Sequence, residues 1–125
     1  MLQENHCTEF KSALNDKFEK AIVAFLNSRD GGSVYIGIDD FGAVIGVNNP
    51  DAVQLEITSR LRDKILPVTL GLYEIRTLMM DNKHVIQVKV ASGPEKPYYI
   101  RDKGMSPAGC FTRVGSASIP MDVHQ

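Results

Sequence analysis

The sequence predicts an α+β domain in which a mixed, mainly antiparallel sheet carries two principal helices. Two observations indicate the helices: apolar residues recur at helical spacing within residues 15–28 and again within residues 51–66. A third observation indicates the sheet, because the other apolar residues alternate in short runs separated by glycine, asparagine and aspartate turns. Since runs joined by short turns form hairpins, most strand pairs are expected to be antiparallel.

The chain is expected to begin with a short extended piece at residues 8–14. Asn15 or Asp16 then caps the first helix, since both side chains accept hydrogen bonds from the free amides at a helix start. The apolar stripe of this helix consists of Phe18, Ile22, Phe25 and Leu26. The glycine pair at residues 31–32 ends the helix after about Ser28, because glycine adopts a left-handed backbone without steric cost.

A predicted hairpin and the second helix follow. Residues 34–38 alternate in the manner of a strand, Gly42 supports a turn, and residues 43–47 form the return strand. Asp51 is expected to cap the second helix, and Pro67 stops it. The apolar stripe of the second helix consists of Val53, Ile57, Leu61 and Ile65.

Strands dominate the second half of the chain. The expected strands span residues 70–79, 85–90, 97–101 and 110–114. Residues 81–83 form the turn that pairs the first two of them as a hairpin. Residues 116–120 are expected to approach another helix. We therefore expect residues 1–125 to be one domain, the N-terminal part of a longer protein.

Composition limits the classes of function. The hydrophobic share of 43% and the charged share of 23% are those of an ordinary globular protein, and no apolar run or N-terminal signal indicates a membrane or secreted protein. Cys7 and Cys110 lack the spacing of a zinc site, so we expect free thiols and a cytoplasmic location. The net charge of -1 counts against a strongly electrostatic nucleic-acid binder, although a basic face remains compatible with it.

Four carboxylates are candidate metal ligands: Glu4, Glu9, Asp39 and Asp40. If the N-terminal strand pairs near the hairpin tip, these groups converge and hold Mg²⁺ or Mn²⁺, which can activate water against a phosphodiester. The alternative is structural, because aspartates are common turn formers and Glu4 lies near a chain end.

A basic and aromatic group occurs late in the chain and is a candidate nucleic-acid surface, since Lys and Arg bind phosphates and tyrosine offers a stacking face. An exposed strand edge with core aromatics explains the same pattern equally well. The candidate nucleic-acid-binding residues are Lys11, Lys96, Tyr98, Arg101, Lys103 and Arg113. The glycines at 31, 32 and 37 do not match a phosphate-binding loop, because their turn leads from a helix into a strand.

Four blocks, in order, resemble the Schlafen AlbA-like domain. They are residues 4–11 (ENHCTEFK), 24–32 (AFLNSRDGG), 36–46 (IGIDDFGAVIG) and 111–116 (FTRVGS). Leu26, Ser28 and Phe111 depart from the family pattern, which has a small residue, threonine and tyrosine there. The blocks together cover nearly the whole chain.

The resemblance implies a cytoplasmic nucleic-acid-binding domain of a bacterial transcriptional regulator, with DNA favoured over RNA and no cofactor required for binding. Schlafen relatives that cleave RNA imply an alternative: a Mg²⁺- or Mn²⁺-dependent endoribonuclease whose catalytic acids would be Glu4, Glu9 and Asp40, with Asp39 as a neighbouring ligand. Such enzymes build a groove from two domains, which would require a homodimer here. A nucleotide-binding or protein-interaction module is the third possibility.

Overall fold

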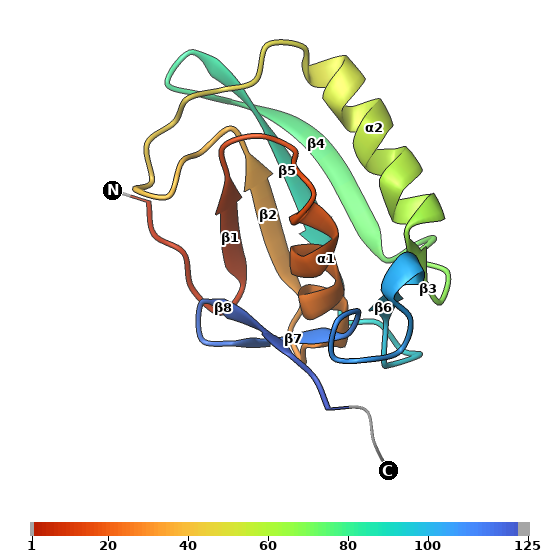
Figure 1. Ribbon diagram of the computed structural model, residues 1–125. Coiled ribbons are helices and arrows are strands. Elements are labelled where there is room, and N and C mark those ends of the chain that lie inside the picture. Colours follow the sequence, from red (N-terminus) through yellow and green to blue (C-terminus); the bar gives the residue numbers. More distant parts are fainter. Residues whose placement is uncertain (1, 123–125) are drawn as a thin grey trace.

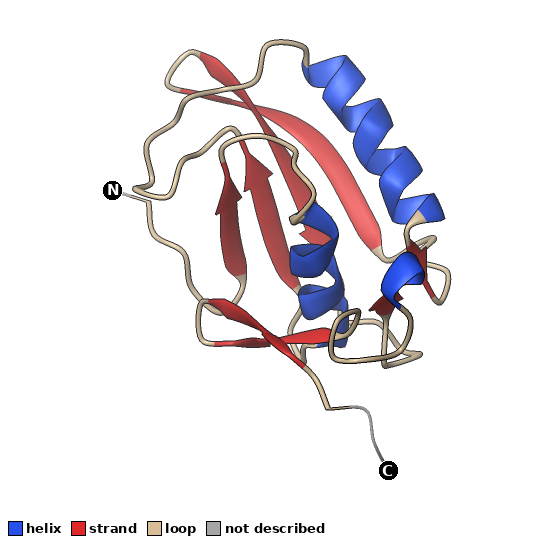
Figure 2. Cartoon of the chain, in the orientation of Figure 1, coloured by secondary structure: helices blue, strands red, loops and turns tan. Residues whose placement is uncertain are grey.

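Four strands form the main sheet of the computed structural model, which describes residues 2–122. Their spatial order is β1-β2-β5-β4, and their bounds are Thr8–Lys11, Gly32–Ile36, Lys83–Val90 and Tyr73–Met80. The β1–β2 pair is parallel, whereas β2–β5 and β5–β4 are antiparallel. Helices α1 (Phe18–Asn27) and α2 (Pro50–Asp63) lie on the same side of this sheet (Figures 1 and 2). The α+β class and the two helices are therefore as predicted.

Two smaller strand pairs complete the fold. β3 (Ile65–Leu66) pairs with β6 (Tyr99–Ile100), and the short helix η1 (Arg101–Lys103) follows β6. β7 (Phe111–Val114) and β8 (Ala117–Pro120) form a hairpin that lies across one end of α1 and beside β1 (Figure 1). Neither principal helix in the described part of the chain has the length and apolar character that a membrane crossing requires.

The core lies between the sheet and the two helices. α1 contributes most of it, because nine of its ten residues are buried. Val34, Ile36, Ile86 and Val88 cover the facing side of the sheet, and α2 adds Ile57 and Leu61. A smaller cluster of Phe10, Ile38 and Val85 lies on the opposite side of the sheet.

The N-terminal caps differ from the predicted ones. α1 begins at Phe18, and Asn15 forms a turn before it by accepting the Lys17 amide at Oδ1 (2.9 Å). The cap of α2 is Asn49, not Asp51, because Asn49 Oδ1 accepts the Ala52 amide at 3.3 Å. Pro50 then takes the first helical position, where its missing amide hydrogen costs nothing.

The corner between α1 and β2 requires glycine. Gly31 has φ +69°, and a Cβ there would lie 2.2 Å from the Val90 carbonyl oxygen. A Cβ on Gly32 would lie 2.4 Å from the Phe25 ring. The pair therefore serves close packing. α1 itself ends at Asn27 with an extended Ser28, so the glycines follow the helix end that they were predicted to cause.

The second helix ends at Asp63, so Ile65 belongs to β3 and not to the helix stripe that was predicted to run up to Pro67. Two other predicted elements are wrong. Residues 43–47 do not form a return strand, since a single bridge between Ile38 and Val44 is the pairing there, and Gly42 and Gly46 both have positive φ. Residues 116–120 do not approach a helix, because β8 pairs back on β7 through a turn at Gly115, where φ is +59°. In both segments, contacts with other parts of the chain determine the secondary structure that forms.

Candidate functional site

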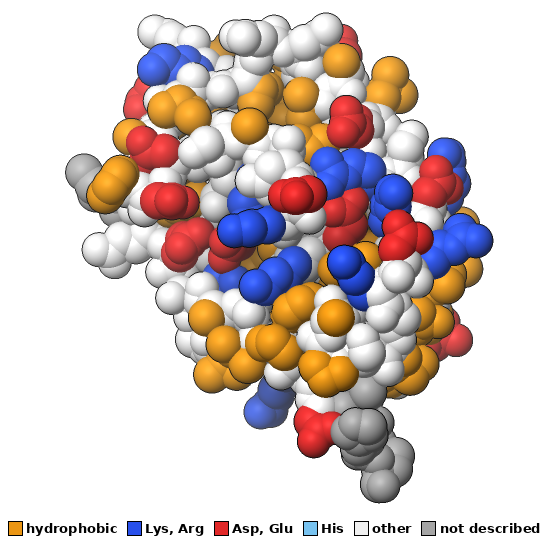
Figure 3. All heavy atoms as spheres, viewed as in Figure 1, with side chains coloured by type: hydrophobic (Ala, Val, Ile, Leu, Met, Phe, Trp, Pro, Cys, Tyr) orange, Lys and Arg blue, Asp and Glu red, His pale blue; other side chains and the backbone are white. Residues whose placement is uncertain are grey.

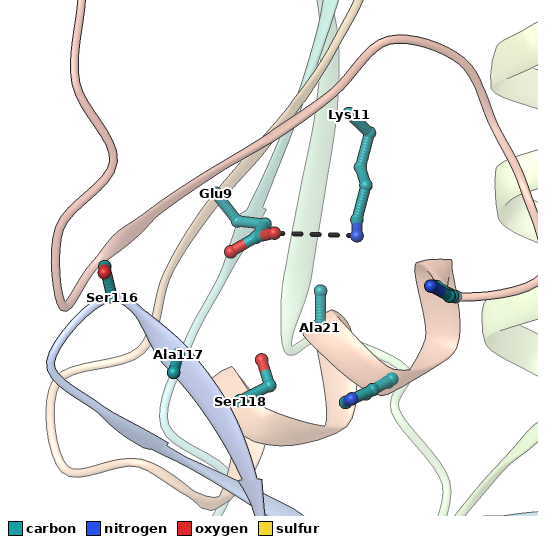
Figure 4. Close-up of a pocket in the computed structure, with 8 residues that line it drawn as sticks. Glu9, Lys11, Ala21, Ser116, Ala117 and Ser118 are labelled. Carbon is teal, nitrogen blue, oxygen red and sulfur yellow. Dashed lines mark ion pairs between the residues drawn. The ribbon is translucent and has the colours of Figure 1, made fainter. Parts of the chain in front are cut away.

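A hollow of about 260 Å³ opens where β1, α1 and the β7–β8 hairpin meet. Figure 4 shows its lining, in which Glu9 and Lys11 point toward each other and Ser116, Ala117 and Ser118 line the hairpin side. The lining residues are Glu9, Lys11, Lys17, Lys20, Ala21, Ser116, Ala117 and Ser118. Three cations and two hydroxyl groups therefore surround one carboxylate.

The strand register places Glu9 and Lys11 on the helix side of the sheet. Glu9 is level with Val34 and Lys11 with Ile36, and both of these β2 residues belong to the main core. Because β1 is an edge strand, its helix-side residues border solvent beside α1 instead of being enclosed.

The start of α1 supplies the other two lysines. Lys17 precedes the helix, and Lys20 follows three residues later, so both lie on the same side. Lys20 Nζ also lies 5.1 Å from the centroid of the Phe111 ring on β7. Among the described residues, neither lysine forms an ion pair, whereas Lys11 Nζ lies 3.5 Å from Glu9 Oε2.

The Glu9 carboxylate is already neutralised. Its Oε1 atom lies 2.7 Å from Nη1 of Arg113, in addition to the Lys11 contact at Oε2. Two cations thus share this one carboxylate, and Lys17 and Lys20 add two further positive charges that no carboxylate in the described part of the chain pairs. Figure 3 shows the wider setting: Lys and Arg side chains gather over the middle of this face, with carboxylates among and beside them.

Glu4 lies against Glu9 and completes the edge of β1. Its Oε2 atom accepts the Phe10 amide at 2.9 Å. Burial raises the pKa of the Glu4 carboxyl above its ordinary value, and the charge and hydrogen bond of Glu9 raise it further, while the Phe10 amide and Arg113 oppose them. Glu4 and Glu9 thus come together as the sequence suggested.

The other two predicted metal ligands lie in a turn. Asp39 Oδ1 accepts the amides of Phe41 and Ala43, each at 2.9 Å, so this carboxylate closes the loop after β2. Asp40 is exposed. Within residues 2–122, no three His, Cys, Asp or Glu side chains are grouped closely enough to hold a metal ion.

Arg113 is an interior residue. Its side chain is 2% exposed, and its Nη2 atom donates to the carbonyls of Asn5 (3.0 Å) and Thr8 (3.1 Å). Its guanidinium carbon lies 4.9 Å from the Phe25 ring centroid, and Nη1 also donates to Ser118 Oγ. These contacts join the hairpin to β1, so the side chain has no free face for a phosphate.

Tyr98 is fully buried as well. Its backbone amide donates to Asn27 Oδ1 at 2.6 Å, and its ring packs where a side chain on Gly93 would be. A ring without exposed surface offers no stacking platform in this conformation.

The remaining predicted contacts lie elsewhere. Lys96 donates through Nζ to Ser92 Oγ and to the Gly93 carbonyl, within its own loop. Arg101 and Lys103 are exposed on η1, and Lys103 borders a second hollow of about 580 Å³ on the other side of the start of α1. That hollow mixes bases with acids, including the Glu19–Arg60 ion pair that joins the two helices. Of the six predicted residues, Lys11 alone lines the first hollow, between β1, α1 and the β7–β8 hairpin, which we call the basic hollow.

Sequence reasoning missed Lys17, Lys20 and the serines of the hairpin. The three-residue spacing of the lysines indicates one helix face, and Ser116 lies within a motif block. Neither signal shows that this face adjoins Lys11, because that depends on the parallel β1–β2 pairing.

Three comparisons place the chain among known proteins. The family model of Schlafen, AlbA_2 matches residues 4–122. The crystal structure of the DIP2311 protein from Corynebacterium diphtheriae is similar with a TM-score of 0.67 and 20% identity, over 94% of this chain and 22% of that chain. The solution structure of the N-terminal domain of a RecG-related protein from Nitrosomonas europaea is similar with a TM-score of 0.64 and 24% identity, over 95% of this chain and 84% of that chain. No curated protein matches.

Proposed function

Because the chain belongs to the Schlafen, AlbA_2 family, we propose that it binds nucleic acid through phosphate contacts at the hollow between β1, α1 and the β7–β8 hairpin. The convergence of Lys11, Lys17 and Lys20 supports this proposal above any other observation. Ammonium groups that neutralise phosphates release condensed counterions, which is the main source of sequence-independent affinity.

The state of Glu9 makes the hollow suitable for an anion. A free carboxylate at its wall would repel phosphate, but Glu9 is paired with Arg113 and Lys11. The hydroxyl groups of Ser116 and Ser118 can donate to phosphate oxygens beside the lysines. The whole chain has a net charge of -1, so we expect modest affinity that is lost as salt rises.

We further propose DNA ahead of RNA as the partner, and a role in transcriptional regulation. The similar Nitrosomonas domain belongs to a protein named as related to a DNA helicase, which supports DNA. The regulatory role rests on the family resemblance of the four motif blocks.

The test is a binding titration at about 50 mM salt, a condition under which phosphate contacts are strong. Fluorescence anisotropy with a labelled duplex, its single strand and the matching RNA compares the wild type with Lys17→Gln, Lys20→Gln and the double variant. Each variant should weaken binding, and the double variant most. Lys89→Gln, which removes an exposed charge on the opposite side of the sheet, is the matched control. Equal loss in this control would overturn the assignment to the hollow.

A second candidate function is metal-dependent cleavage of RNA. The observation that favours it is the contact of the Glu4 and Glu9 carboxylates beside the lysines. The donor set suits a hard cation in kind, because Mg²⁺ and Mn²⁺ are often held by one or two carboxylates with water and phosphate oxygens as the other ligands. A cation at Glu9 Oε2 would take the place of Lys11, which lies 3.5 Å from that atom. A bound cation would activate water for attack on a phosphodiester.

Two readouts separate this candidate from simple binding. Mn²⁺ should raise the melting temperature of the wild type and not that of Glu9→Gln, since ligand binding to the folded state stabilises it. A labelled tRNA should be cut by the wild type with Mn²⁺ and left intact by Glu9→Gln. An RNA that stays intact in both cases removes the nuclease candidate and leaves the binding proposal unaffected.

A further inference from the structure

The two edge strands of the main sheet, β1 and β4, differ in whether their outward backbone groups have hydrogen-bond partners. At the β1 edge, side chains and a preceding turn occupy the outward backbone groups. The Phe10 amide donates to Glu4 Oε2, the Thr8 amide donates to the Asn5 carbonyl, and Arg113 donates to the Thr8 carbonyl. This four-residue edge is therefore closed to another strand.

The β4 edge is open along eight residues. In the described part of the chain, the backbone of Tyr73–Met80 makes no hydrogen bond except those of its ladder with β5. The strand has no proline and no bulge, which are two of the usual devices that protect an edge, and its two charged side chains, Glu74 and Arg76, are of opposite sign. Exposed apolar side chains also occur on α2, on β4 and on the segment between them: Leu55, Val68, Leu70 and Met79.

The two charged side chains of β4, Glu74 and Arg76, indicate which kind of strand would pair with this edge. Glu74 is level with Lys89 and Arg76 with Gln87, which places both on the side of the sheet that carries no helix. Arg76 Nη2 lies 3.2 Å from Glu74 Oε2 on the same strand. A strand with one acid and one base two residues apart is complementary to an antiparallel copy of itself.

We propose that a second copy of this chain pairs with β4 edge to edge, antiparallel and centred on Ile75. In this register Glu74 lies opposite the partner's Arg76, and Arg76 opposite the partner's Glu74. A parallel in-register pair would set like charges beside each other, and so would antiparallel registers centred on either charge. The contact is isologous, so it closes as a dimer instead of growing into a fibre.

The test is a charge exchange read by analytical ultracentrifugation without nucleic acid, so its outcome is independent of the binding proposal. Wild type should sediment as a dimer. Glu74→Arg and Arg76→Glu should each sediment as monomers, because each creates like-charge pairs across the dimer axis. The variant that carries both substitutions should be dimeric again. A mixture of the two single variants should form a heterodimer, since one strand is then wholly basic and the other wholly acidic at these positions.

Asp16→Arg and Lys17→Glu are the matched controls, because they make the same changes of charge at exposed positions before α1 and should leave the dimer intact. A monomeric wild type at every concentration would overturn the proposal. Dimers that persist in both single variants would also overturn it, because the copies would then associate through another surface. Slowed amide exchange confined to β4 in the wild-type dimer should accompany the expected result.

Discussion

The Glu9 carboxylate lies 2.7 Å from Nη1 of Arg113, whose side chain is 2% exposed. Removal of Arg113 leaves the mostly buried Glu9 with Lys11 as its cation and takes away the donor to the Asn5 and Thr8 carbonyls. Breaking a buried ion pair by removing one partner typically costs about 3–5 kcal/mol. We therefore expect Arg113→Ala to lower the free energy of unfolding by about that amount, as measured by urea denaturation. Arg62→Ala breaks the exposed pair with Asp63 and should change stability by less than about 1 kcal/mol. An Arg113→Ala protein of normal stability with weakened DNA binding would instead make Arg113 a phosphate contact.

The pH dependence of the free energy of unfolding should show the titration of the Glu4 carboxyl. Burial and then Glu9 raise the pKa of this carboxyl above 4.5, so the folded state holds the proton more tightly than the unfolded chain. Stability is therefore full below the unfolded pKa and decreases as pH rises through the folded one. Glu4→Gln keeps an acceptor for the Phe10 amide and removes this titration.

Urea unfolding of wild type and Glu4→Gln between about pH 4 and pH 7 checks this expectation. The variant should become the more stable protein as pH rises, whereas Glu95→Gln, an exposed substitution, should follow the wild type. Parallel curves for all three proteins would show that Glu4 titrates normally.

Asn27 should be essential for stability. Its Nδ2 atom donates to the carbonyls of Tyr98 and Phe111, each at 2.9 Å, and its Oδ1 accepts the Tyr98 amide. Asn27→Ala leaves three buried backbone groups without partners, so we expect a loss of about 2–4 kcal/mol in urea denaturation. Asn48→Ala, at an exposed position, should have little effect. A small loss at Asn27 would show that water replaces the amide.

The slope of DNA affinity against salt concentration should depend on how many lysines of the hollow contact phosphates. A plot of log affinity against log salt has a slope of about 0.9 for each phosphate that is neutralised on duplex DNA. Lys17→Gln and Lys20→Gln should each reduce the slope by about that amount, and the double variant by about twice as much. An unchanged slope with lower affinity would mean that the lysines act through folding.

The fold was largely predictable because its strongest signals are local. Apolar spacing identified both helices, and alternation identified β2 and β5. The failures lie where local preference is weak. Glycines with positive φ prevent residues 43–47 from forming a strand ladder, and β8 exists because β7 offers it a partner. The β3–β6 pair is two residues long on each side, which is too short for a periodic signal.

The candidate site was predictable only in part. The pair Glu4 and Glu9 was foreseen from its motif, and the structure brings the two together. Tyr98 and Arg113 are of residue types that are common in nucleic-acid-binding surfaces, but residue type does not show burial, and both side chains are interior. Lys17 and Lys20 join Lys11 through the parallel pairing of distant segments, which no local pattern contains.

Arg113 also has a consequence for the order of synthesis. It ties β7 to Asn5, Thr8 and Glu9, so the walls of the basic hollow come from segments more than 100 residues apart in the chain. On a ribosome, β1 and α1 emerge early, but the hollow cannot form until the final hairpin has left the exit tunnel. The phosphate contacts proposed for the hollow therefore become available only when nearly all of residues 4–122 have been made.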